Sequence, residues 1–348
     1  MGVLLYIYLG PILIRQNNVA LDDVGVVDTT IVATTNTNEA DIGGEKIQEG
    51  TYDEESLLAR VRRTARSKTT PVPVVISTPV SIPATPTTTS PATTAAATLK
   101  SILIGSDTFS TVYTVKEAGS MLESTNQNWW VSSGAYLYSS GGVGSTIRGA
   151  LSAIDPWRVA FYLSNSLDTD GGYYPQNIFR LVLKSTWLNY KQEAYFKIIN
   201  DNLSVSPNRN ASNGLLLFNR YQDAFNLYYT GVRVDGYAVI KKKINGEYFT
   251  LAYKPIGTPT VYNRDTNPNQ LPKNTWIGLK SEVKTNSDGT VSIKLYMDKG
   301  RTGVWVLVAE AMDDGKSFGG GALLKEGYAG IRTDFMDVEF DDYFGVKI

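Results

Sequence analysis

The stretch LYYTGVRVDGYAVIKKKINGEYFTLAY, residues 227–253, decides the fold class. Polar and apolar side chains alternate along it, and Asp235-Gly236 and Asn245-Gly246 interrupt it at two points. Alternation with a period of two is typical of β-strands, and Asp-Gly and Asn-Gly are the pairs that favour tight hairpin turns. The stretch therefore predicts three consecutive antiparallel strands.

Three lysines, residues 241–243, lie inside the middle strand of this stretch. Alternate residues of a strand point to opposite faces, so Ile240, Lys242 and Ile244 share one face, while Lys241 and Lys243 share the other. The first face is mostly apolar and should pack on the core. Lys242 would then lie near an edge, or extend its ammonium group outward along its stem. We expect Lys241 and Lys243 to stand in water.

The face that carries the two outer lysines is a candidate binding surface. Tyr237 shares it, and the preceding strand places Tyr229 and Arg233 together on one of its own faces. If the register brings Arg233 beside the lysines, a basic strip lined by tyrosines results, which Arg220 on the strand before would extend. Arginine holds carboxylates through two parallel hydrogen bonds, so such a strip suits acidic sugars. The alternative is a solvated sheet face whose lysines serve solubility.

Composition divides the chain into four segments. Residues 1–18 are apolar and are interpreted as a signal or anchor segment. Residues 19–68 are predicted to be largely disordered, with a short helix near 52–66, and residues 69–100 form a Thr/Pro-rich linker. All six tryptophans and all eleven phenylalanines lie after residue 100, so the core belongs to a single domain, residues 101–348.

The residue types that are absent exclude several kinds of chemistry. The chain contains no Cys and no His, which excludes disulfides, thiolate or imidazole metal sites, and Ser-His-Asp catalysis. The formal net charge is −1, and residues 100–348 hold 26 basic and 24 acidic side chains. This balance does not indicate nucleic-acid binding.

Short strand patterns follow one another through the predicted domain, separated by turns rich in Gly, Asn, Asp and Pro. The clearest patterns span residues 157–164, 177–184, 194–200, 214–221, 290–298 and 304–310. Such a succession predicts an all-β fold, an antiparallel sandwich or barrel. A weak helical pattern spans residues 116–123.

Several segments of the domain together carry a resemblance to a known superfamily. The domain opens with Asp107-Thr108-Phe109, continues through NGLLLFNRYQDAFNLYYTGVRVDGYAVIKKKINGEYFTLA, TWIGLKSEV, VSIKLYMD and VWVLVAEAMDD, and closes with GYAGIRTDFMDVEFDDYFGV. With its Gly-Ile-Arg turn and its last strand rich in Phe and Asp, it resembles the LamG-like jelly-roll branch of the concanavalin A-like lectin/glucanase superfamily. The resemblance implies an antiparallel β-sandwich that binds a polysaccharide or other glycan, secreted or held at the cell surface through the N-terminal segment.

The resemblance leaves an enzyme and a structural protein open as alternatives. Retaining hydrolases of this fold carry two catalytic carboxylates on an ExDxxE strand, and no such motif occurs after residue 100. The alternating acids Asp337, Glu339 and Asp341 are interpreted as part of the closing strand. A structural or adhesive surface protein, whose sandwich binds another protein, is the remaining alternative.

A polysaccharide lyase is the enzyme that this composition favours. Lyases of this fold abstract a proton beside a uronate carboxylate, often with a tyrosine, after an arginine has neutralised that carboxylate. Tyr229 would act as the base, and Arg220 and Arg233 would neutralise the carboxylate. Many such lyases also use a His, which this chain lacks, so a binding module is favoured over an enzyme.

Two further predictions concern a metal and a sugar-stacking ring. Sandwiches of this superfamily often bind structural Ca²⁺ where the first and last strands meet, and Asp107 and Asp341 are the matching candidates. Trp129 and Trp130 are adjacent, so on a strand they point to opposite faces and only one of them can enter the core. Trp130 is the candidate for stacking on a sugar ring.

Overall fold

A computed structural model describes residues 7–9, 12–14 and 103–348. The chain divides into two compact units, residues 1–52 and 53–348. In the first unit, β1 (Ile7–Leu9) and β2 (Ile12–Ile14) pair as an antiparallel hairpin. The predicted disordered segment 19–68 with its helix near 52–66, the linker 69–100 and the rest of the apolar segment lie outside the described residues. In the described part, no helix has the length and apolar character needed to cross a bilayer.

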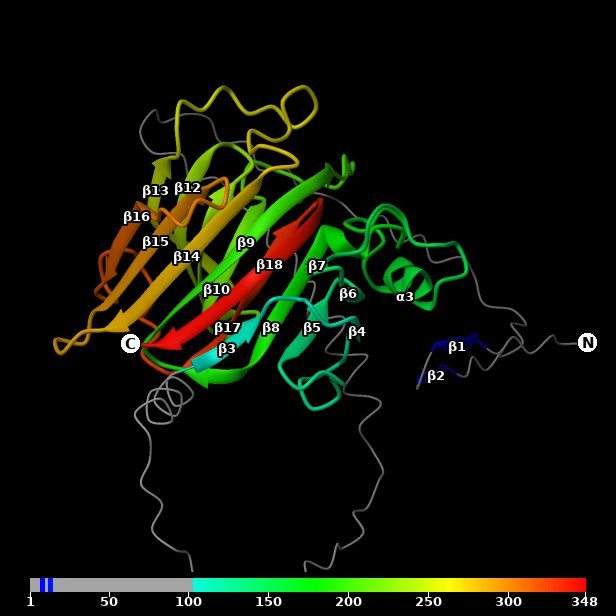
Figure 1. The fold of residues 1–348 in the computed structure, drawn as a ribbon, viewed down its shortest axis with the longest axis horizontal. Helices are drawn as coiled ribbons and strands as arrows, with labels where there is room; N and C mark the ends of the chain where they lie inside the picture. Colours follow the sequence, from blue (N-terminus) through cyan, green and yellow to red (C-terminus); the bar gives the residue numbers. More distant parts are fainter. Residues whose placement is uncertain (1–6, 10–11, 15–102) are drawn as a thin grey trace, which may run out of the picture. The chain divides into compact units, whose positions relative to one another are not determined.

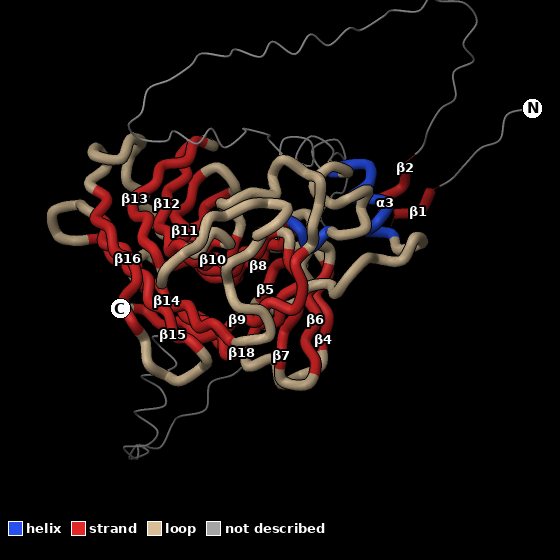
Figure 2. The backbone as a smooth tube through the Cα atoms, turned by 90° about the horizontal axis from the view of Figure 1, so that it is seen from above, coloured by secondary structure: helices blue, strands red, loops and turns tan. Residues whose placement is uncertain are grey.

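The second unit contains two antiparallel sheets packed face to face (Figures 1 and 2). One sheet has seven strands in the order β13-β12-β11-β10-β17-β8-β5. Their bounds are β5 Trp129–Ser133, β8 Ile178–Trp187, β10 Gly214–Asp223, β11 Asn226–Arg233, β12 Tyr237–Ile244, β13 Glu247–Pro255 and β17 Gly327–Asp334. The predicted hairpins at Asp235-Gly236 and Asn245-Gly246 join β11 to β12 and β12 to β13.

The other sheet has nine strands. Eight of them follow the order β16-β15-β14-β9-β18-β7-β6-β4, and β3 pairs with β18 beside this path. Their bounds are β3 Leu103–Asp107, β4 Tyr113–Lys116, β6 Tyr136–Ser140, β7 Val143–Ser145, β9 Tyr190–Asp201, β14 Trp276–Thr285, β15 Val291–Lys299, β16 Val306–Asp313 and β18 Met336–Lys347. Together the two sheets confirm the predicted antiparallel β-sandwich.

The main hydrophobic core lies between the sheets. From the seven-stranded sheet it receives residues such as Leu217 and Ile331, which are cross-strand partners, and from the nine-stranded sheet Phe196 and Phe340, which are also partners. Trp129 belongs to this core. Because neighbours in a strand point to opposite faces, the alternate residues of each sheet form an outer face that points away from the core.

Two local predictions were wrong. Residues 157–164, predicted as a strand, lie in the helix α3 (Pro156–Asn165), and residues 117–123 form no helix. The Asp155 carboxylate accepts a hydrogen bond from the Trp157 amide at 2.8 Å, and Pro156 occupies the first helical turn, so α3 begins at a capped N-terminus. Phe161 packs this helix against Ile178 at the start of β8, after the short 3₁₀ helix Pro175–Asn177.

Candidate functional site

The outer face of the seven-stranded sheet gathers most of the residues predicted to bind a ligand. Phe218, Tyr229 and Lys241 are cross-strand partners in β10, β11 and β12, so they form one row on one face. Trp130 of β5 is the partner of Val182 in β8, and both pack in the same outer cluster as Tyr229. The strand register therefore places these predicted residues on one face, the outer face of the sheet: Tyr229, Arg233, Tyr237, Lys241, Lys243 and Trp130.

Lys241 and Lys243 lie against aromatic rings at one end of this face. The Lys243 ammonium is 4.7 Å from the centroid of the Tyr248 ring and 5.6 Å from that of Phe225, and Lys241 is 5.6 Å from the Tyr248 centroid. Tyr229 meets the edge of Tyr248 at a centroid distance of 6.1 Å. Lys243 is partly exposed, but Lys241 is only 5% exposed, so the prediction that both stand in water is wrong for Lys241.

Arg233 is held in a closed cluster at the other end of β11. Its guanidinium pairs with the Asp235 carboxylate at 2.7 Å and lies 4.9 Å from the centroid of the Tyr253 ring. The Tyr253 hydroxyl donates to the same carboxylate at 2.8 Å, and Tyr253 stacks on Tyr237 at a centroid distance of 4.2 Å. Burial and then the Asp235 carboxylate raise the pKa of Tyr253 above its ordinary value. Arg233 thus orders this end of the face through contacts within the chain.

Two arginines that the sequence analysis did not select occupy the middle of the face. Arg332 of β17 and Arg180 of β8 are directly opposite each other in the register, and Arg332 has Leu216 of β10 as its other neighbour. The Arg332 Nε donates to the Asp334 carboxylate at 2.8 Å. Both arginines lie at positions whose side chains point outward from their strands. Counting alternate residues along these two strands would have identified them from the sequence.

The electrostatic environment favours the charged form of Arg332. Burial opposes that form, but the Asp334 carboxylate and the hydroxyls of Tyr248 and Tyr229 raise the pKa of the guanidinium well above its usual range. The side chain of Arg332 is 23% exposed, so it is accessible from outside the sheet. The other carboxylate oxygen of Asp334 is buried and has no hydrogen-bond partner among the described residues. Asp334 is also among the residues that line a cavity of about 20 Å³, which has room for one water molecule but not for a sugar.

Arg220 does not belong to this face, which corrects its assignment to the basic strip. Its guanidinium donates to the carbonyls of Leu188 and Leu323 and to the Thr285 hydroxyl, and the residue is fully buried. The cause is an irregularity in β10, where Arg220 has a positive φ of 50°. Beyond it the strand resumes with Tyr221 on the outer face.

Lys242 is also placed differently from its prediction. It is fully buried rather than extended toward solvent, and its ammonium pairs with the equally buried Asp313 carboxylate at 2.9 Å. The Tyr228 hydroxyl donates to the second oxygen of that carboxylate at 2.5 Å, and Lys242 also donates to the Gly320 carbonyl at 3.3 Å. A buried charge needs such partners, so Lys242 ties β12 to the loop that follows β16.

The residues predicted to bind calcium, Asp107 and Asp341, have polar partners within the chain. The Asp107 carboxylate accepts hydrogen bonds from the Phe109 amide, the Tyr113 hydroxyl and the Trp129 indole, all donors that a cation would have to displace. The Asp341 carboxylate pairs with Arg301 at 2.7 Å. Among residues 103–348 no three acidic side chains are grouped so that they could hold a metal ion. The calcium prediction remains untested.

The outer face of the nine-stranded sheet is also aromatic and charged. The ring of Trp276 lies 4.7 Å from the Lys197 ammonium and 5.1 Å from the Arg301 guanidinium. Lys197 pairs in turn with Glu339, and Arg301 with Asp341. Two of the alternating acids, Glu339 and Asp341, therefore neutralise cations of their own sheet. The third, Asp337, accepts hydrogen bonds from the Gly149 backbone amide and from the Gln176 and Asn202 side-chain amides.

The same pattern continues toward the neighbouring strands. The Lys280 ammonium lies 4.0 Å from the centroid of the Trp305 ring and pairs with Glu193 at 2.8 Å. Tyr195 lies 5.6 Å from Trp305, and its hydroxyl donates to the buried Asp298 carboxylate at 2.8 Å. On this sheet the ring faces are covered by cations, and those cations are neutralised by carboxylates.

Several solved structures share features of this architecture at low similarity. Carbohydrate binding module CBM66 from Bacillus subtilis is 18% identical, with 49% of this chain and 82% of that chain covered and a TM-score of 0.35. A protein with a galectin-like fold from Bacillus subtilis is 12% identical over 63% of this chain and 89% of that chain, with a TM-score of 0.37. LamAcat from Zobellia galactanivorans is 11% identical over 71% and 98% of the two chains, with a TM-score of 0.37.

At these TM-scores the similarities carry no functional argument, and the fold rests on the strand pairing described above. No protein-family model matches the sequence, and no curated protein matches it. Any function must therefore be argued from the residues of the sheet faces.

Proposed function

We propose that residues 103–348 bind an acidic polysaccharide on the outer face of the seven-stranded sheet. The observation that carries the proposal is the register that sets Arg332 directly opposite Arg180 in the middle of this face. Like charges that face each other across two strands destabilise a sheet. Asp334 already pairs with Arg332, and an anionic ligand lying over both guanidinium groups would add a further counter-charge.

The neighbouring side chains support a sugar acid as the anion. Guanidinium groups bind carboxylates through paired, directional hydrogen bonds, and the partly exposed Lys243 near the end of β12 adds charge without strict geometry. Tyrosines and a tryptophan surround the cations and offer flat apolar surfaces for the carbon-bearing faces of sugar rings. The partly exposed rings are Trp130, Tyr248 and Tyr328, whereas Tyr221 and Tyr229 of the same cluster are buried. They extend over strands β5 to β13, a span that suits an extended chain rather than a single sugar.

The proposal is for binding rather than for catalysis. In the lyase hypothesis, Arg220 and Arg233 neutralise the carboxylate beside Tyr229, but Arg220 is buried among backbone carbonyls and is not on this face. Arg233 is on the face and is paired with Asp235. The residues proposed for proton abstraction and carboxylate neutralisation are therefore not assembled as the hypothesis requires.

We further propose that the protein is secreted or attached to the cell surface through its N-terminal segment. The apolar residues 1–18 and the Thr/Pro-rich composition of residues 69–100 support this location. Treating intact cells with a protease that cannot enter them tests it. The proposed location requires digestion of the protein under these conditions, and complete protection until the cells are lysed would refute it.

Polygalacturonate and its methyl ester test the binding function. The ester keeps the sugar backbone and removes the carboxylate charge, so we expect the full chain to bind the acid form in calorimetry and not the ester. Arg332→Gln and Arg180→Gln should each weaken binding. Lys280→Gln, on the other sheet, is the matched control and should not. Equal binding of acid and ester, or equal loss in all three variants, would contradict the proposal.

A further inference from the structure

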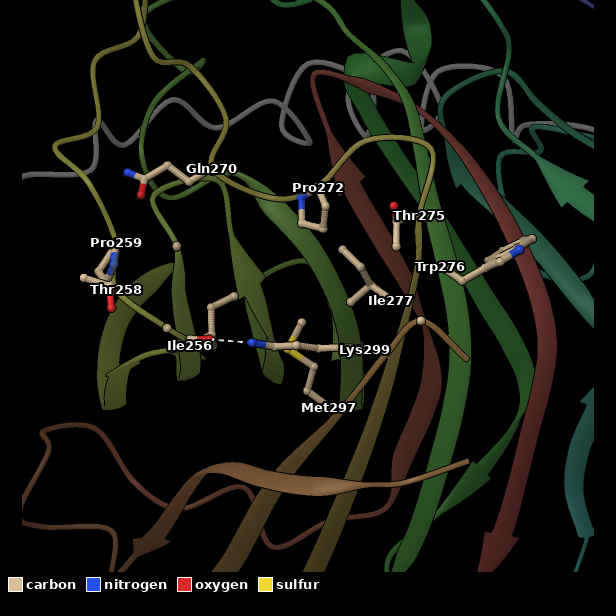
Figure 3. A pocket seen from close by; sticks show the side chains of 13 residues that line it. Ile256, Thr258, Pro259, Gln270, Pro272, Thr275, Trp276, Ile277, Met297 and Lys299 are labelled. Atoms are coloured by element: carbon tan, nitrogen blue, oxygen red, sulfur yellow. Dashed lines mark hydrogen bonds between the residues drawn. The ribbon is translucent and has the colours of Figure 1, made fainter. Parts of the chain in front are cut away.

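A cavity of about 350 Å³ lies where the chain leaves β13 and returns to β14 (Figure 3). Ile277 of β14 and Met297 of β15 line it from the strands, and Ile256, the first residue after β13, lines it as well. Pro259 and Pro272 line it from the loop 256–275. These five side chains give the cavity an apolar interior.

The larger polar side chains among the lining residues are bonded to the loop, point away from the cavity or lie at its rim, so the interior remains apolar. The Gln270 amide is used by the loop itself, since it accepts from the Thr260 amide and donates to the Thr260 carbonyl, both at 2.7 Å. The side chain of Trp276 points away from the cavity (Figure 3) and lies beside cations on the other side of the sheet. Lys299 is the charged side chain among the lining residues, and it is exposed.

Lys299 is positioned at the edge of the cavity by a bond that leaves it charged and accessible. Its ammonium donates to the Ile256 carbonyl at 3.0 Å, which is drawn as a dashed line in Figure 3. An ammonium group has three donors, so two remain after this bond for a ligand or solvent. The cavity thus combines an apolar interior with one cation at its rim.

The loop over the cavity is fixed by its own contacts. The Asn267 side chain donates to the Thr260 hydroxyl at 2.9 Å and to the Val261 carbonyl at 2.8 Å. Arg209, from the segment before β10, donates to the Arg264 carbonyl and anchors the far part of the loop. A loop of this length without regular structure is uncommon in a compact domain unless it serves a function. Its ordering makes the cavity a preformed one, as small-molecule sites usually are.

The volume sets the size of the ligand. An apolar cavity of about 150 Å³ is sufficient to bind benzene, and small-molecule sites begin at roughly 300 Å³. The cavity of this domain therefore accommodates a body of about eight to ten carbon atoms. A purely polar ligand such as a monosaccharide would find few partners in it.

We propose that this cavity binds a small amphipathic anion, with its apolar body against Ile256, Pro259 and Pro272 over the buried Ile277 and Met297, and its acid group at Lys299. The site is separate from the polysaccharide face, because none of its lining residues belongs to that face. A carboxylate, sulfonate or phosphate would satisfy the same chemistry at the rim. The proposal therefore stands or falls independently of polysaccharide binding.

Octanoate and octan-1-ol are suitable probes, because they share an apolar chain and differ in charge. In the full chain labelled with ¹³C at the methionine methyl groups, we expect octanoate to shift the Met297 signal and leave those of Met121 and Met312 unchanged. The Met297→Leu variant assigns the signal. No shift at Met297 at saturating octanoate, or equal shifts at all three methionines, would overturn the proposal.

Variants at the exposed Lys299 test the charge. Lys299→Gln should weaken octanoate binding about fivefold and leave octan-1-ol binding unchanged, as expected for a partly exposed ion pair. Lys299→Arg should restore most of the octanoate affinity, and Lys294→Gln on the same strand should have no effect. Octanoate binding that is unaffected by Lys299→Gln would contradict the role assigned to the rim.

Discussion

The two outer faces of the sandwich both place cations beside aromatic rings, but they arrange the charges differently. On the nine-stranded sheet, cations lie over tryptophan rings and are neutralised by carboxylates of the same sheet, as in the pairs Lys197–Glu339 and Lys280–Glu193. On the seven-stranded sheet, Arg332 faces Arg180 across the central strands. Aromatic rings beside cations therefore do not by themselves define a binding face. Ion pairs occur on both faces, since Arg332 pairs with Asp334 and Arg233 with Asp235 on the seven-stranded sheet. The two surfaces differ in that like charges are cross-strand partners at the centre of the seven-stranded face.

The largest predicted effect is a loss of stability on substitution of Lys242, which lies between the two sheets. Lys242→Met would leave the buried Asp313 carboxylate without its cation, and removing one partner of a buried ion pair costs about 3–5 kcal/mol of unfolding free energy. Urea denaturation would measure the loss. Lys243→Gln, one residue further along β12, is the control and should change stability by less than about 0.5 kcal/mol. A loss below about 1 kcal/mol for Lys242→Met would mean that Lys242 is not buried.

The next largest effect concerns the seven-stranded face. Arg332→Gln should weaken polygalacturonate binding by about 30-fold, since truncating one partner of a hydrogen-bonded charge pair costs about 2 kcal/mol or more. Arg332→Lys keeps the charge but loses the paired donors. Its affinity for polygalacturonate should therefore lie between that of Arg332→Gln and that of the wild type. Thermal denaturation checks that both variants fold. Unchanged affinity in a folded Arg332→Gln protein would remove this face from the proposal.

A third prediction concerns stability on the nine-stranded face. Burial opposes ionisation of Asp298, but hydrogen bonds from Thr302, Tyr195 and Gly303 outweigh it and lower the pKa of the carboxyl below its ordinary value. A lowered pKa in the folded state stabilises the protein above the unfolded-state pKa, and this stabilisation disappears as the pH falls through the folded-state pKa.

Asp298→Asn should therefore lower the melting temperature at pH 7, and the difference from the wild type should shrink as the pH falls below about 3.9, the unfolded-state value. Polygalacturonate affinity at pH 7 should not change, because Asp298 is on the other sheet. A difference in melting temperature that grows toward acid pH would contradict the assigned cause.

The smallest effects come from single lysines on the two faces. Lys243→Gln should weaken polygalacturonate binding about threefold, and Lys280→Gln by less than about twofold, because exposed ion pairs contribute about 0.2–1 kcal/mol. Raising the salt concentration should reduce the first difference, since salt screens exposed charges. Measuring the polygalacturonate affinity of both variants at two ionic strengths provides the check. A larger loss of affinity for Lys280→Gln than for Lys243→Gln would indicate that the nine-stranded face is the binding face.

The fold and the face that several candidate residues share followed from local patterns in the sequence. Period two placed Tyr229 and Lys241 on the same side of two strands, because hairpins with Asp-Gly and Asn-Gly turns fix the register between neighbours. Counting alternate residues along β17 in the same way would have placed Arg332 on this face. The helix α3 was also readable, because Asp155-Pro156 is a start signal and Trp157 and Phe161 are spaced by four residues.

Other features depend on contacts between distant parts of the chain. The burial of Lys242 depends on Asp313, which lies on a strand of the other sheet, and no local pattern indicates that partner. The inward turn of Arg220 results from an irregularity in β10, which shifts the alternation that the prediction assumed. The neutral character of the nine-stranded face likewise arises from ion pairs between strands that are far apart in sequence.

Lysine footprinting tests the central claim most directly. The full chain would be acetylated with and without saturating polygalacturonate, and modification at each lysine would be measured by mass spectrometry. We predict that the polymer protects Lys243 and leaves Lys280 and Lys294 as reactive as before. Protection of Lys280 with no protection of Lys243 would show that the acidic chain lies on the nine-stranded face, and would contradict the account.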